Sequence, residues 1–266
     1  MGEKYVIGLD YGTLSCRAAL VVCGTGEILA DTVQPYKHQV MDQTLPDGKT
    51  KLSRNWALQH PQDYLDAMEI TIKSVLEQTG ICGECVIGIG IDFTSCTMLP
   101  IDKEGTPFCM KPGYESRPHA YVKLWKHHAA QYEADKINEI LSRGQYREKY
   151  KIDEKVSSEL LLPKAMQILD EDPQLYAEAD QLLEAGDWLT RTLTGSGKRS
   201  ASTAGYKAWW EEGRGYPEKG FYEAFDSRLQ NFVEEKLKGE GLPPARVEGY
   251  RSNSWILLDW GNVVIH

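Results

Sequence analysis

The first part of the chain alternates between short apolar runs and tight turns, and this alternation strongly restricts its fold. Residues 5–10, 16–23 and 28–33 have the length and the apolar content of β-strands. Two glycine-containing turns, at residues 11–13 and 24–27, separate them. Strands joined by such short turns pair antiparallel, so the sequence predicts a meander of three strands at the start of a sheet.

A helix and further strands follow. Pro61 opens a segment with helical apolar spacing that ends at Gly80, because a proline is tolerated in the first helical turn and a glycine favours the end. Residues 86–92 read as a buried strand, and residues 98–101 as one more. The order β-β-β-α-β predicts an α/β fold in which helices pack on a mixed sheet.

The middle of the chain is predicted to be mostly helical. Periodic apolar positions occur in residues 118–142, 159–170 and 186–194. Residues 42–59 are polar and rich in turn residues, so we expect an exposed excursion there. These segments add helices to the sheet-based part of the fold.

Composition excludes several classes of protein. The chain has 266 residues and a formal net charge of −9, which disfavours general nucleic-acid binding. No apolar run approaches the ~18 residues of a membrane span, and the N-terminus does not resemble a signal peptide. Six scattered cysteines are too few for a disulfide scaffold, so we expect a cytoplasmic protein with reduced thiols. The sequence leaves homodimer formation open.

The turn after the first strand is the first candidate site. Asp10 ends the strand, and Gly12, Thr13 and Ser15 follow in the turn. Backbone N–H groups of such a turn can hold phosphate, and a carboxylate beside phosphate requires a cation such as Mg²⁺. The residues alone leave an ordinary hairpin as the alternative.

Two further segments combine polar and aromatic residues. Residues 92–97 follow a buried strand and carry hydroxyl side chains that suit a polyol, although a polar turn explains them equally well. Lys207 lies between glycine and tryptophans in residues 203–210. A lysine there can bind a sugar, or its stem can cover a half-buried aromatic cluster.

Two other patterns are not interpreted as metal or redox sites. Cys82 and Cys85 follow a helix and precede a strand, the reverse of a thioredoxin-like arrangement, and no second pair accompanies them. His127 and His128 are adjacent, so on a helix they point in different directions.

Five segments, in this order, resemble the FGGY carbohydrate kinases, and within that family the branch that phosphorylates L-ribulose. They are GLDYGTLSCRA, Gln59–Tyr64, GIGIDFTSCTMLPID, LWKHHAA and Ser202–Trp210 with Lys207, the last resembling a strand of the sugar pocket. The resemblance spans residues 5–245.

The resemblance implies an actin/hexokinase-type fold with two RNase H-like lobes. It implies ATP and Mg²⁺ as cofactors, and transfer of the γ-phosphoryl group to L-ribulose, which gives L-ribulose 5-phosphate in L-arabinose breakdown. Matched by position, the phosphate and metal side contains Asp10, Gly12, Thr13 and Arg17, with Asp10 at the metal, and the sugar side contains Ser95, Trp125 and Lys207.

The end of the chain departs from the family pattern. Family members are about twice as long, and their general base and adenosine site lie in the second lobe. We therefore expect an N-terminal domain at residues 1–245 and an atypical, truncated or frameshifted tail at residues 246–266. We assign the role of general base to no residue of this chain, and Asp259 is not given that role either. A fragment of this kind is expected to be inactive. The alternatives are a related xylulose or polyol kinase, and a non-catalytic remnant that binds sugar or phosphate.

Overall fold

The computed structural model describes residues 2–238, 241–242, 246–248, 257–259 and 264–265. The chain divides into two compact units. Unit 1 contains residues 1–40, 60–94 and 243–266, and unit 2 contains residues 41–59 and 95–242. Hence the chain crosses from unit 1 to unit 2 twice before residue 100, the second time between Thr94 and Ser95.

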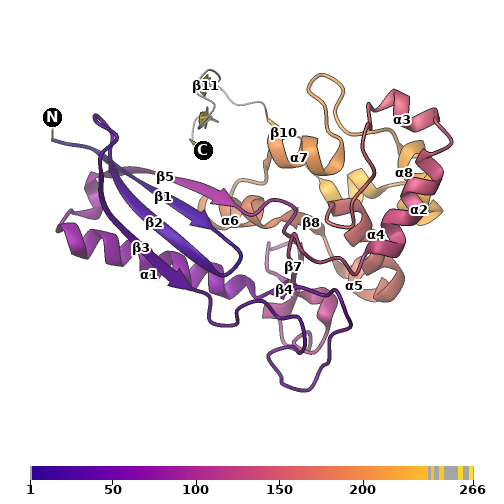
Figure 1. Ribbon diagram of the computed structural model, residues 1–266, viewed down its shortest axis with the longest axis horizontal. Coiled ribbons are helices and arrows are strands. Elements are labelled where there is room, and N and C mark those ends of the chain that lie inside the picture. The colour runs from indigo at the N-terminus through magenta and orange to yellow at the C-terminus, as the bar shows by residue number, and fades with distance from the viewer. Residues whose placement is uncertain (1, 239–240, 243–245, 249–256, 260–263, 266) are drawn as a thin grey trace. The chain divides into compact units, whose positions relative to one another are not determined.

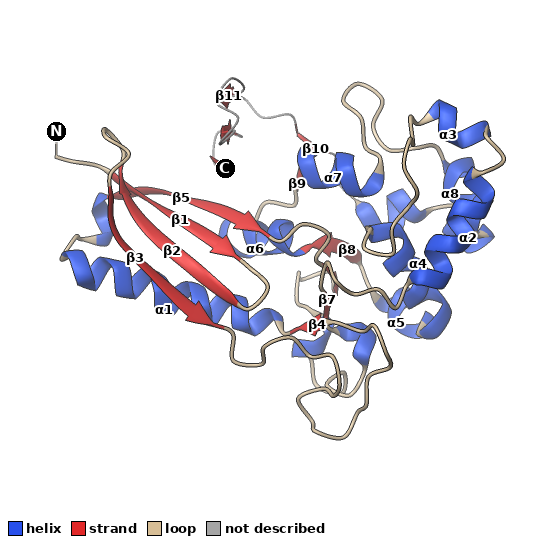
Figure 2. Ribbon diagram, in the orientation of Figure 1, coloured by secondary structure: helices blue, strands red, loops and turns tan. Residues whose placement is uncertain are grey.

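Unit 1 is built on a four-stranded mixed sheet with the order β3-β2-β1-β5. Strands β1, β2 and β3 pair antiparallel, and β5 pairs parallel to β1, so the predicted β-β-β-α-β arrangement is confirmed (Figures 1 and 2). The elements are β1 (Tyr5–Tyr11), β2 (Ser15–Val22), β3 (Ile28–Pro35), α1 (Pro61–Thr79) and β5 (Val86–Phe93).

Helix α1 packs on one face of this sheet, against β2 and β3. His60 caps the helix, since its Nδ1 accepts a hydrogen bond of 3.2 Å from the Gln62 N–H, and Gly80 ends it at a φ of 68°. Alternate residues of the two central strands, among them Leu9, Tyr11 and Cys16, are buried. Helix α1 therefore covers one face of the sheet, and the intervening residues point to the opposite face.

Unit 2 contains a second four-stranded sheet with the order β4-β7-β6-β8, in which all pairs are antiparallel. Its strands are β4 (Leu58–Gln59), β6 (Met98–Ile101), β7 (Val122–Lys123) and β8 (Gln181–Glu184). Strands β9 (Arg199–Ser200) and β10 (Gly241–Leu242) pair parallel. In unit 1, β11 (Arg246–Glu248), β12 (Leu257–Asp259) and β13 (Val264–Ile265) pair antiparallel.

Helices form the remainder of unit 2. They are α2 (Gln131–Leu141), α3 (Gln145–Lys149), α4 (Leu161–Glu171), α5 (Pro173–Glu178), α6 (Ala185–Thr194), α7 (Ala201–Ala208) and α8 (Lys219–Phe225). Unit 2 also has single 3₁₀ turns at Phe108–Met110, Pro118–Ala120 and Ser227–Leu229, and a π-helical turn at Val233–Leu237, whereas the 3₁₀ turn at Gly83–Cys85 belongs to unit 1. Residues 161–169 of α4 are all buried, so this helix lies in the core of unit 2.

Two predictions about unit 2 are wrong. Residues 118–142 are not one helix: residues 122 and 123 form β7, and α2 begins only at Gln131. Residues 42–59 are not simply exposed, because Trp56 and Leu58 are buried. In both cases strand pairing decides the local structure, since Leu58 of β4 lies opposite Lys123 of β7. Such pairing overrides the apolar spacing along the chain.

The expected domain boundary at residue 245 and most of the expected tail at residues 246–266 lie outside the described residues. Among the described helices, none is long and apolar enough to cross a membrane.

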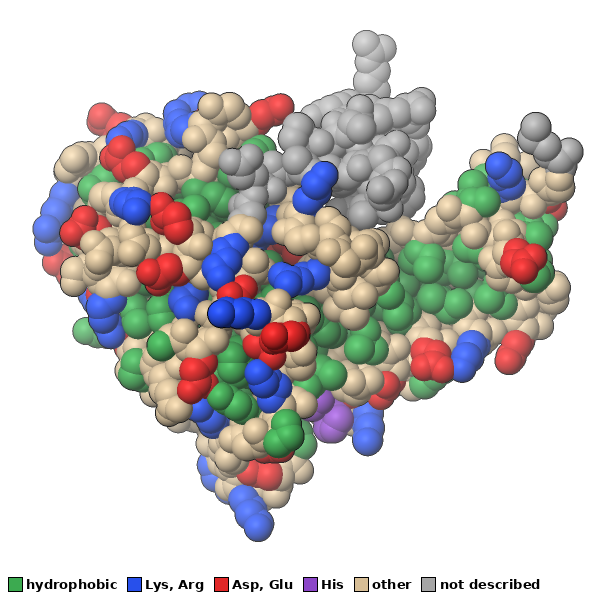
Figure 3. Space-filling model, turned by 180° about the vertical axis from the view of Figure 1, so that it is seen from behind, with side chains coloured by type: hydrophobic (Ala, Val, Ile, Leu, Met, Phe, Trp, Pro, Cys, Tyr) green, Lys and Arg blue, Asp and Glu red, His purple; other side chains and the backbone are tan. Residues whose placement is uncertain are grey.

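In unit 1, edge strands β3 and β5 carry the exposed apolar side chains of Ile28, Val33 and Ile87. Figure 3 shows hydrophobic side chains gathered on the side of unit 1 that it draws. Exposed apolar surface of this kind favours association with another surface.

Candidate functional site

Asp10 lies near the end of β1, on the sheet face that α1 does not cover. The buried side chains of Leu9 and Tyr11 flank it, whereas Asp10 is itself exposed. Its paired neighbours are Arg17 on β2 and Asp92 on β5. Because paired residues point to the same face of a sheet, two carboxylates and a guanidinium lie side by side there.

The hairpin that joins β1 to β2 is held by backbone contacts. The Gly12 N–H donates to the Ser15 carbonyl oxygen at 3.0 Å, so this N–H is already used within the turn. The Tyr36 hydroxyl donates to the Gly12 carbonyl oxygen at 3.1 Å, and the Tyr36 N–H donates to the Leu14 carbonyl oxygen at 3.0 Å. Burial raises the pKa of Tyr36 and keeps its hydroxyl protonated as a donor. The loop that contains Gly12 and Thr13 is therefore fixed from the end of β3.

Small residues adjoin Asp10 on the uncovered face. Gly8, two positions before Asp10, pairs with Ala19 on β2 and with Gly90 on β5. A Cβ atom placed on Gly8 would meet no other atom within 4 Å. The backbone is therefore open beside the charged residues, which lets a ligand approach the strands closely.

Asp10 and Asp92 fit a magnesium ion that also binds phosphate. Mg²⁺ is usually held by one or two carboxylates together with phosphate oxygens and water, and does not need a cage of many protein ligands. Within the described ranges, no group of three or more metal-ligating side chains is close enough to hold an ion by itself. The prediction named Asp10 alone. The paired Asp92 was missed as a metal candidate, although its place at the end of a strand parallel to β1 was the available signal.

Ser95 and Trp125 lie in two turns that leave the same end of the unit 2 sheet. Ser95 is in the turn before β6, and Trp125 is in the turn after β7. Strands β6 and β7 are antiparallel, with Met98 opposite Lys123, so the start of one strand adjoins the end of the other. Both side chains are exposed. The structure thus brings these two predicted sugar-side residues to one place in the fold.

Lys207 lies in a helix, so its assignment to a strand is wrong. Residues 201–208 form α7, which packs against α4. The side chain of Lys207 lies outside the described ones. An acceptor from another helix binds Ser200 and Thr203 at the start of α7.

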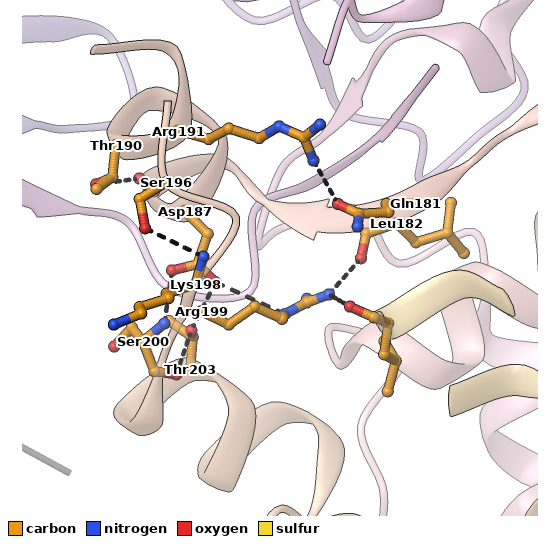
Figure 4. Close-up of polar contacts among 12 residues, drawn as sticks. Gln181, Leu182, Asp187, Thr190, Arg191, Ser196, Lys198, Arg199, Ser200 and Thr203 are labelled. Carbon is orange, nitrogen blue, oxygen red and sulfur yellow. Dashed lines mark hydrogen bonds and ion pairs between the residues drawn. The ribbon is translucent and has the colours of Figure 1, made fainter. Parts of the chain in front are cut away.

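That acceptor is Asp187 of α6, which sequence reasoning did not identify. Asp187 Oδ1 accepts the Ser200 N–H at 2.9 Å, and Oδ2 accepts the Thr203 hydroxyl at 3.2 Å (Figure 4). The Arg199 Nε lies 3.8 Å from Asp187 Oδ2, and its Nη1 donates to the carbonyl oxygens of Leu182 and Leu237 at 3.0 Å. Burial raises the pKa of Asp187, and Arg199 opposes that shift. Asp187 therefore anchors the helix that contains Lys207.

The structure also describes the surroundings of His127 and of the cysteine pair, Cys82 and Cys85. His127 is buried, its Nδ1 accepts from the Ala57 N–H at 3.2 Å, and its Nε2 lies 2.8 Å from Gln167 Oε1. Burial lowers the pKa of His127 well below its ordinary value, so it stays neutral with a structural role. Cys82 and Cys85 are exposed free thiols, and Cys82 precedes the 3₁₀ turn that ends at Cys85.

Comparisons with known proteins identify close relatives. The chain is 44% identical over 275 residues to a protein named ribulokinase from Halalkalibacterium halodurans, covering 100% of this chain and 49% of that protein. It is 48% identical over 243 residues to a ribulokinase from Geobacillus thermodenitrificans, covering 91% and 43%. The chain thus spans about half the length of the curated relatives that it matches.

Solved structures of low sequence identity share the fold. The xylulose kinase from Rhodospirillum rubrum superposes with a TM-score of 0.68 at 16% identity, covering 92% of this chain and 45% of that chain. The xylulose kinase from Bifidobacterium adolescentis superposes with a TM-score of 0.67 at 13% identity, covering 99% and 52%. These structures support an N-terminal lobe with the architecture of these sugar kinases, as expected.

Two family descriptions match the sequence. "Ribosomal silencing factor during starvation" matches only residues 227–266, a short segment that the structure describes in part. "FGGY family of carbohydrate kinases, N-terminal domain" matches residues 5–211, which is most of the chain. Together with the identity to the ribulokinases, this match shows that the chain belongs to the FGGY family of carbohydrate kinases.

Proposed function

We propose that this chain supplies the N-terminal domain of an ATP-dependent kinase that phosphorylates L-ribulose. The observation that carries the proposal is its identity of 44% and 48% to two proteins named ribulokinase, over nearly all of the chain. The product would be L-ribulose 5-phosphate, an intermediate of L-arabinose breakdown. The paired charges at Asp10, Asp92 and Arg17 support a site for a metal-bound polyphosphate.

On the phosphate side, Asp10 and Asp92 would hold Mg²⁺, and Arg17 would balance phosphate charge. The bound ion supplies charge neutralisation to the phosphoryl group. The fixed turn of Gly12 and Thr13 would lie against the phosphates. The open glycine-lined face beside Asp10 supports this assignment, because a bulky side chain at Gly8 would narrow it.

On the sugar side, Ser95, Trp125 and Lys207 would contact the substrate. A hydroxyl and an ammonium can hydrogen-bond sugar oxygens, and an indole face packs against a sugar ring or carbon chain. The shared sheet end supports Ser95 and Trp125, and the resemblance supports Lys207. No described residue is assigned as the general base.

The proposed N-terminal domain comprises residues 1–245, with a separate tail at residues 246–266. The identity to the ribulokinases favours L-ribulose over D-xylulose or another polyol, since the xylulose kinases resemble this chain in fold at 13% and 16% identity. A protein that binds sugar without transferring phosphate is the remaining alternative. Homodimer formation and a cytoplasmic location stay predictions.

A chimaera tests the proposal. Residues 1–242 are joined to the C-terminal part of the Geobacillus thermodenitrificans ribulokinase, and ADP release is measured with L-ribulose, D-xylulose or glycerol. We expect kcat/KM for L-ribulose to exceed the other two by at least about tenfold, which corresponds to about 1.4 kcal/mol of discrimination. A preference for D-xylulose or glycerol would overturn the proposed substrate.

The 266-residue chain is measured in parallel. Titration calorimetry with L-ribulose reports binding without turnover, and the same ADP assay reports turnover. Binding without ADP release from either protein would favour the non-catalytic alternative. Sugar-dependent turnover by the 266-residue chain at about 1 s⁻¹, the low end for kinases, would require a general base among its own residues.

A further inference from the structure

We infer that Lys164 is a positioning residue for the proposed sugar site. Its buried ammonium holds the turn that presents Ser95 and the turn that presents Trp125 in one fixed arrangement. The inference rests on the proposed function, because that proposal identifies the site as one that binds sugar. The hydrogen bonds of Lys164 do not depend on it.

The contacts of Lys164 join two segments that are distant in sequence. Lys164 lies in α4 and is 0% exposed. Its Nζ donates to the Cys96 carbonyl oxygen at 2.6 Å and to the Leu124 carbonyl oxygen at 2.9 Å. Cys96 directly follows Ser95, and Leu124 directly precedes Trp125. One ammonium therefore binds the backbone next to each of the two exposed side chains.

The chemistry of these bonds makes them strong constraints. An ammonium removed from water loses its hydration, and it is tolerated only where protein acceptors replace that hydration. Hydrogen bonds from a charged donor are stronger than neutral ones, and a low local dielectric strengthens them further. Movement of either turn away from Lys164 would leave a buried charge with one acceptor fewer.

The backbone at Cys96 shows that its turn is held from outside. Cys96 has a φ of 63°, in the left-handed region that non-glycine residues seldom adopt. Such a conformation persists where surrounding contacts stabilise it. The carbonyl group that Lys164 binds belongs to this same residue, so the lysine stabilises the conformation that places Ser95.

The position of α4 extends this role to the third predicted sugar contact. Helix α7, which contains Lys207, packs against α4. The turns of Ser95 and Trp125 reach α4 through Lys164. A single buried helix therefore supports every segment to which we assign a sugar contact.

Lys236 provides a matched comparison within unit 2. It is also buried, and its Nζ donates to the carbonyl oxygens of Tyr176 and Ala179, each at 2.6 Å. Tyr176 lies in α5 and Ala179 directly follows this helix, so neither residue belongs to the turns of Ser95 and Trp125. Loss of Lys236 should therefore cost a similar pair of bonds without disturbing the proposed sugar site.

The test compares Lys164→Met and Lys236→Met in the 266-residue chain. Methionine keeps an unbranched buried side chain and removes the donor. Hydrogen–deuterium exchange is measured for peptides covering residues 94–97 and 124–128, and L-ribulose binding is measured by titration calorimetry. We expect Lys164→Met to raise exchange in both peptides and to raise the Kd for L-ribulose at least about tenfold, as misplacement of binding groups predicts. Lys236→Met should change neither quantity by more than about twofold, since additive effects are expected for separate sites.

The outcomes separate this inference from the proposed function. If the wild-type chain does not bind L-ribulose, the proposed sugar site fails, and the exchange data still decide whether Lys164 holds both turns. Faster exchange in only one turn, or equal changes in both variants, would overturn the inference. If Lys164→Met does not fold, Lys164→Gln is measured in the same way, since its amide retains a donor. Failure of both Lys164 variants to fold beside a folded Lys236→Met would assign Lys164 to the core alone and overturn the inference.

Discussion

Asp10 of β1 and Asp92 of β5 occupy directly paired positions on adjacent parallel strands of unit 1. Both side chains are exposed on the face that α1 leaves uncovered. Two carboxylates so placed repel each other, and a divalent cation removes this repulsion. The pair therefore links the local strand pattern to the proposed chemistry with metal-bound phosphate.

Asp10→Asn should abolish most turnover of the chimaera and leave its folding intact. The carboxylate is exposed, so its loss removes the proposed metal ligand without opening the core. We expect kcat/KM to fall by about 10²-fold or more, as for the loss of an electrostatic group at a reacting site. Asp31→Asn is the matched control, because Asp31 is an exposed aspartate of β3 in the same sheet. Near-normal turnover with Asp10→Asn would remove this residue from the metal site.

Lys207→Ala should weaken sugar binding. A hydrogen bond from a charged donor is worth about 1.5–3 kcal/mol, so the KM of the chimaera for L-ribulose should rise by more than about tenfold. The KM for ATP should stay within about twofold, since this lysine is assigned to the sugar side alone. Lys198→Ala, at an exposed position of the same unit, serves as the control. An unchanged KM would leave Lys207 with only a packing role.

Asp187→Ala should destabilise unit 2 and release the first turn of α7. The variant leaves the Ser200 N–H without its acceptor and Arg199 without its buried counter-ion. Removing one partner of a buried ion pair costs about 3–5 kcal/mol, measurable as a lower free energy of unfolding in urea. Thr203→Val removes one hydroxyl, which lies within hydrogen-bond distance of Asp187 Oδ2 and of the Ser200 carbonyl oxygen, and should cost only about 1 kcal/mol. Equal losses in the two variants would argue against an anchoring role for Asp187.

Lys123→Met should stabilise the protein at neutral pH. Lys123 is fully buried, and its Nζ has no hydrogen-bond partner among the residues described, although it lies 4.6 Å from the centroid of the Trp56 ring. Burial lowers the pKa of Lys123 from its ordinary 10.5 to about 7. Replacing a buried ionic group by an apolar one of similar size often stabilises by about 1–4 kcal/mol.

The pH dependence of Lys123→Met tests the cause. Between pH 7 and 10.5 the unfolded wild-type chain binds the Lys123 proton more tightly than the folded chain. Wild-type stability should therefore gain a contribution from this residue as pH rises through that interval, and the variant should lack it. The gain in unfolding free energy on substitution should thus be largest below pH 7 and shrink toward pH 10. A gain that is the same at all pH values would exclude titration of Lys123 as its source.

Much of unit 1 could be predicted because its determinants are local. Short apolar runs separated by glycine turns specify the three antiparallel strands, and Pro61 and Gly80 mark the ends of α1 within one residue. Asp10 was identified as a site residue because a carboxylate at a strand end beside a glycine turn is a pattern of neighbours in sequence. Its partner Asp92, about eighty positions away, depends on which strand lies beside β1.

Unit 2 was less predictable because long-range contacts determine it. The apolar spacing of residues 118–142 predicts a helix. Residues 122–123 instead form β7, which pairs with β4 and β6, and a single sequence does not reveal such pairing. Asp187 binds the start of the helix that contains Lys207, and Lys164 binds the turns of Ser95 and Trp125. Each of these polar groups is buried by residues from other segments, so its role is invisible along the chain.

The sequence by itself determined the strand order at the start, the family and the residue types available for phosphate, metal and sugar. Tertiary structure decided which of these residues share a face or a sheet end, and which buried charges hold them there. The physical reason is that strand alternation and helix capping depend on residues within a few positions. Strand pairing and the solvation of a buried ammonium or carboxylate depend on partners that only the folded chain brings within hydrogen-bond distance.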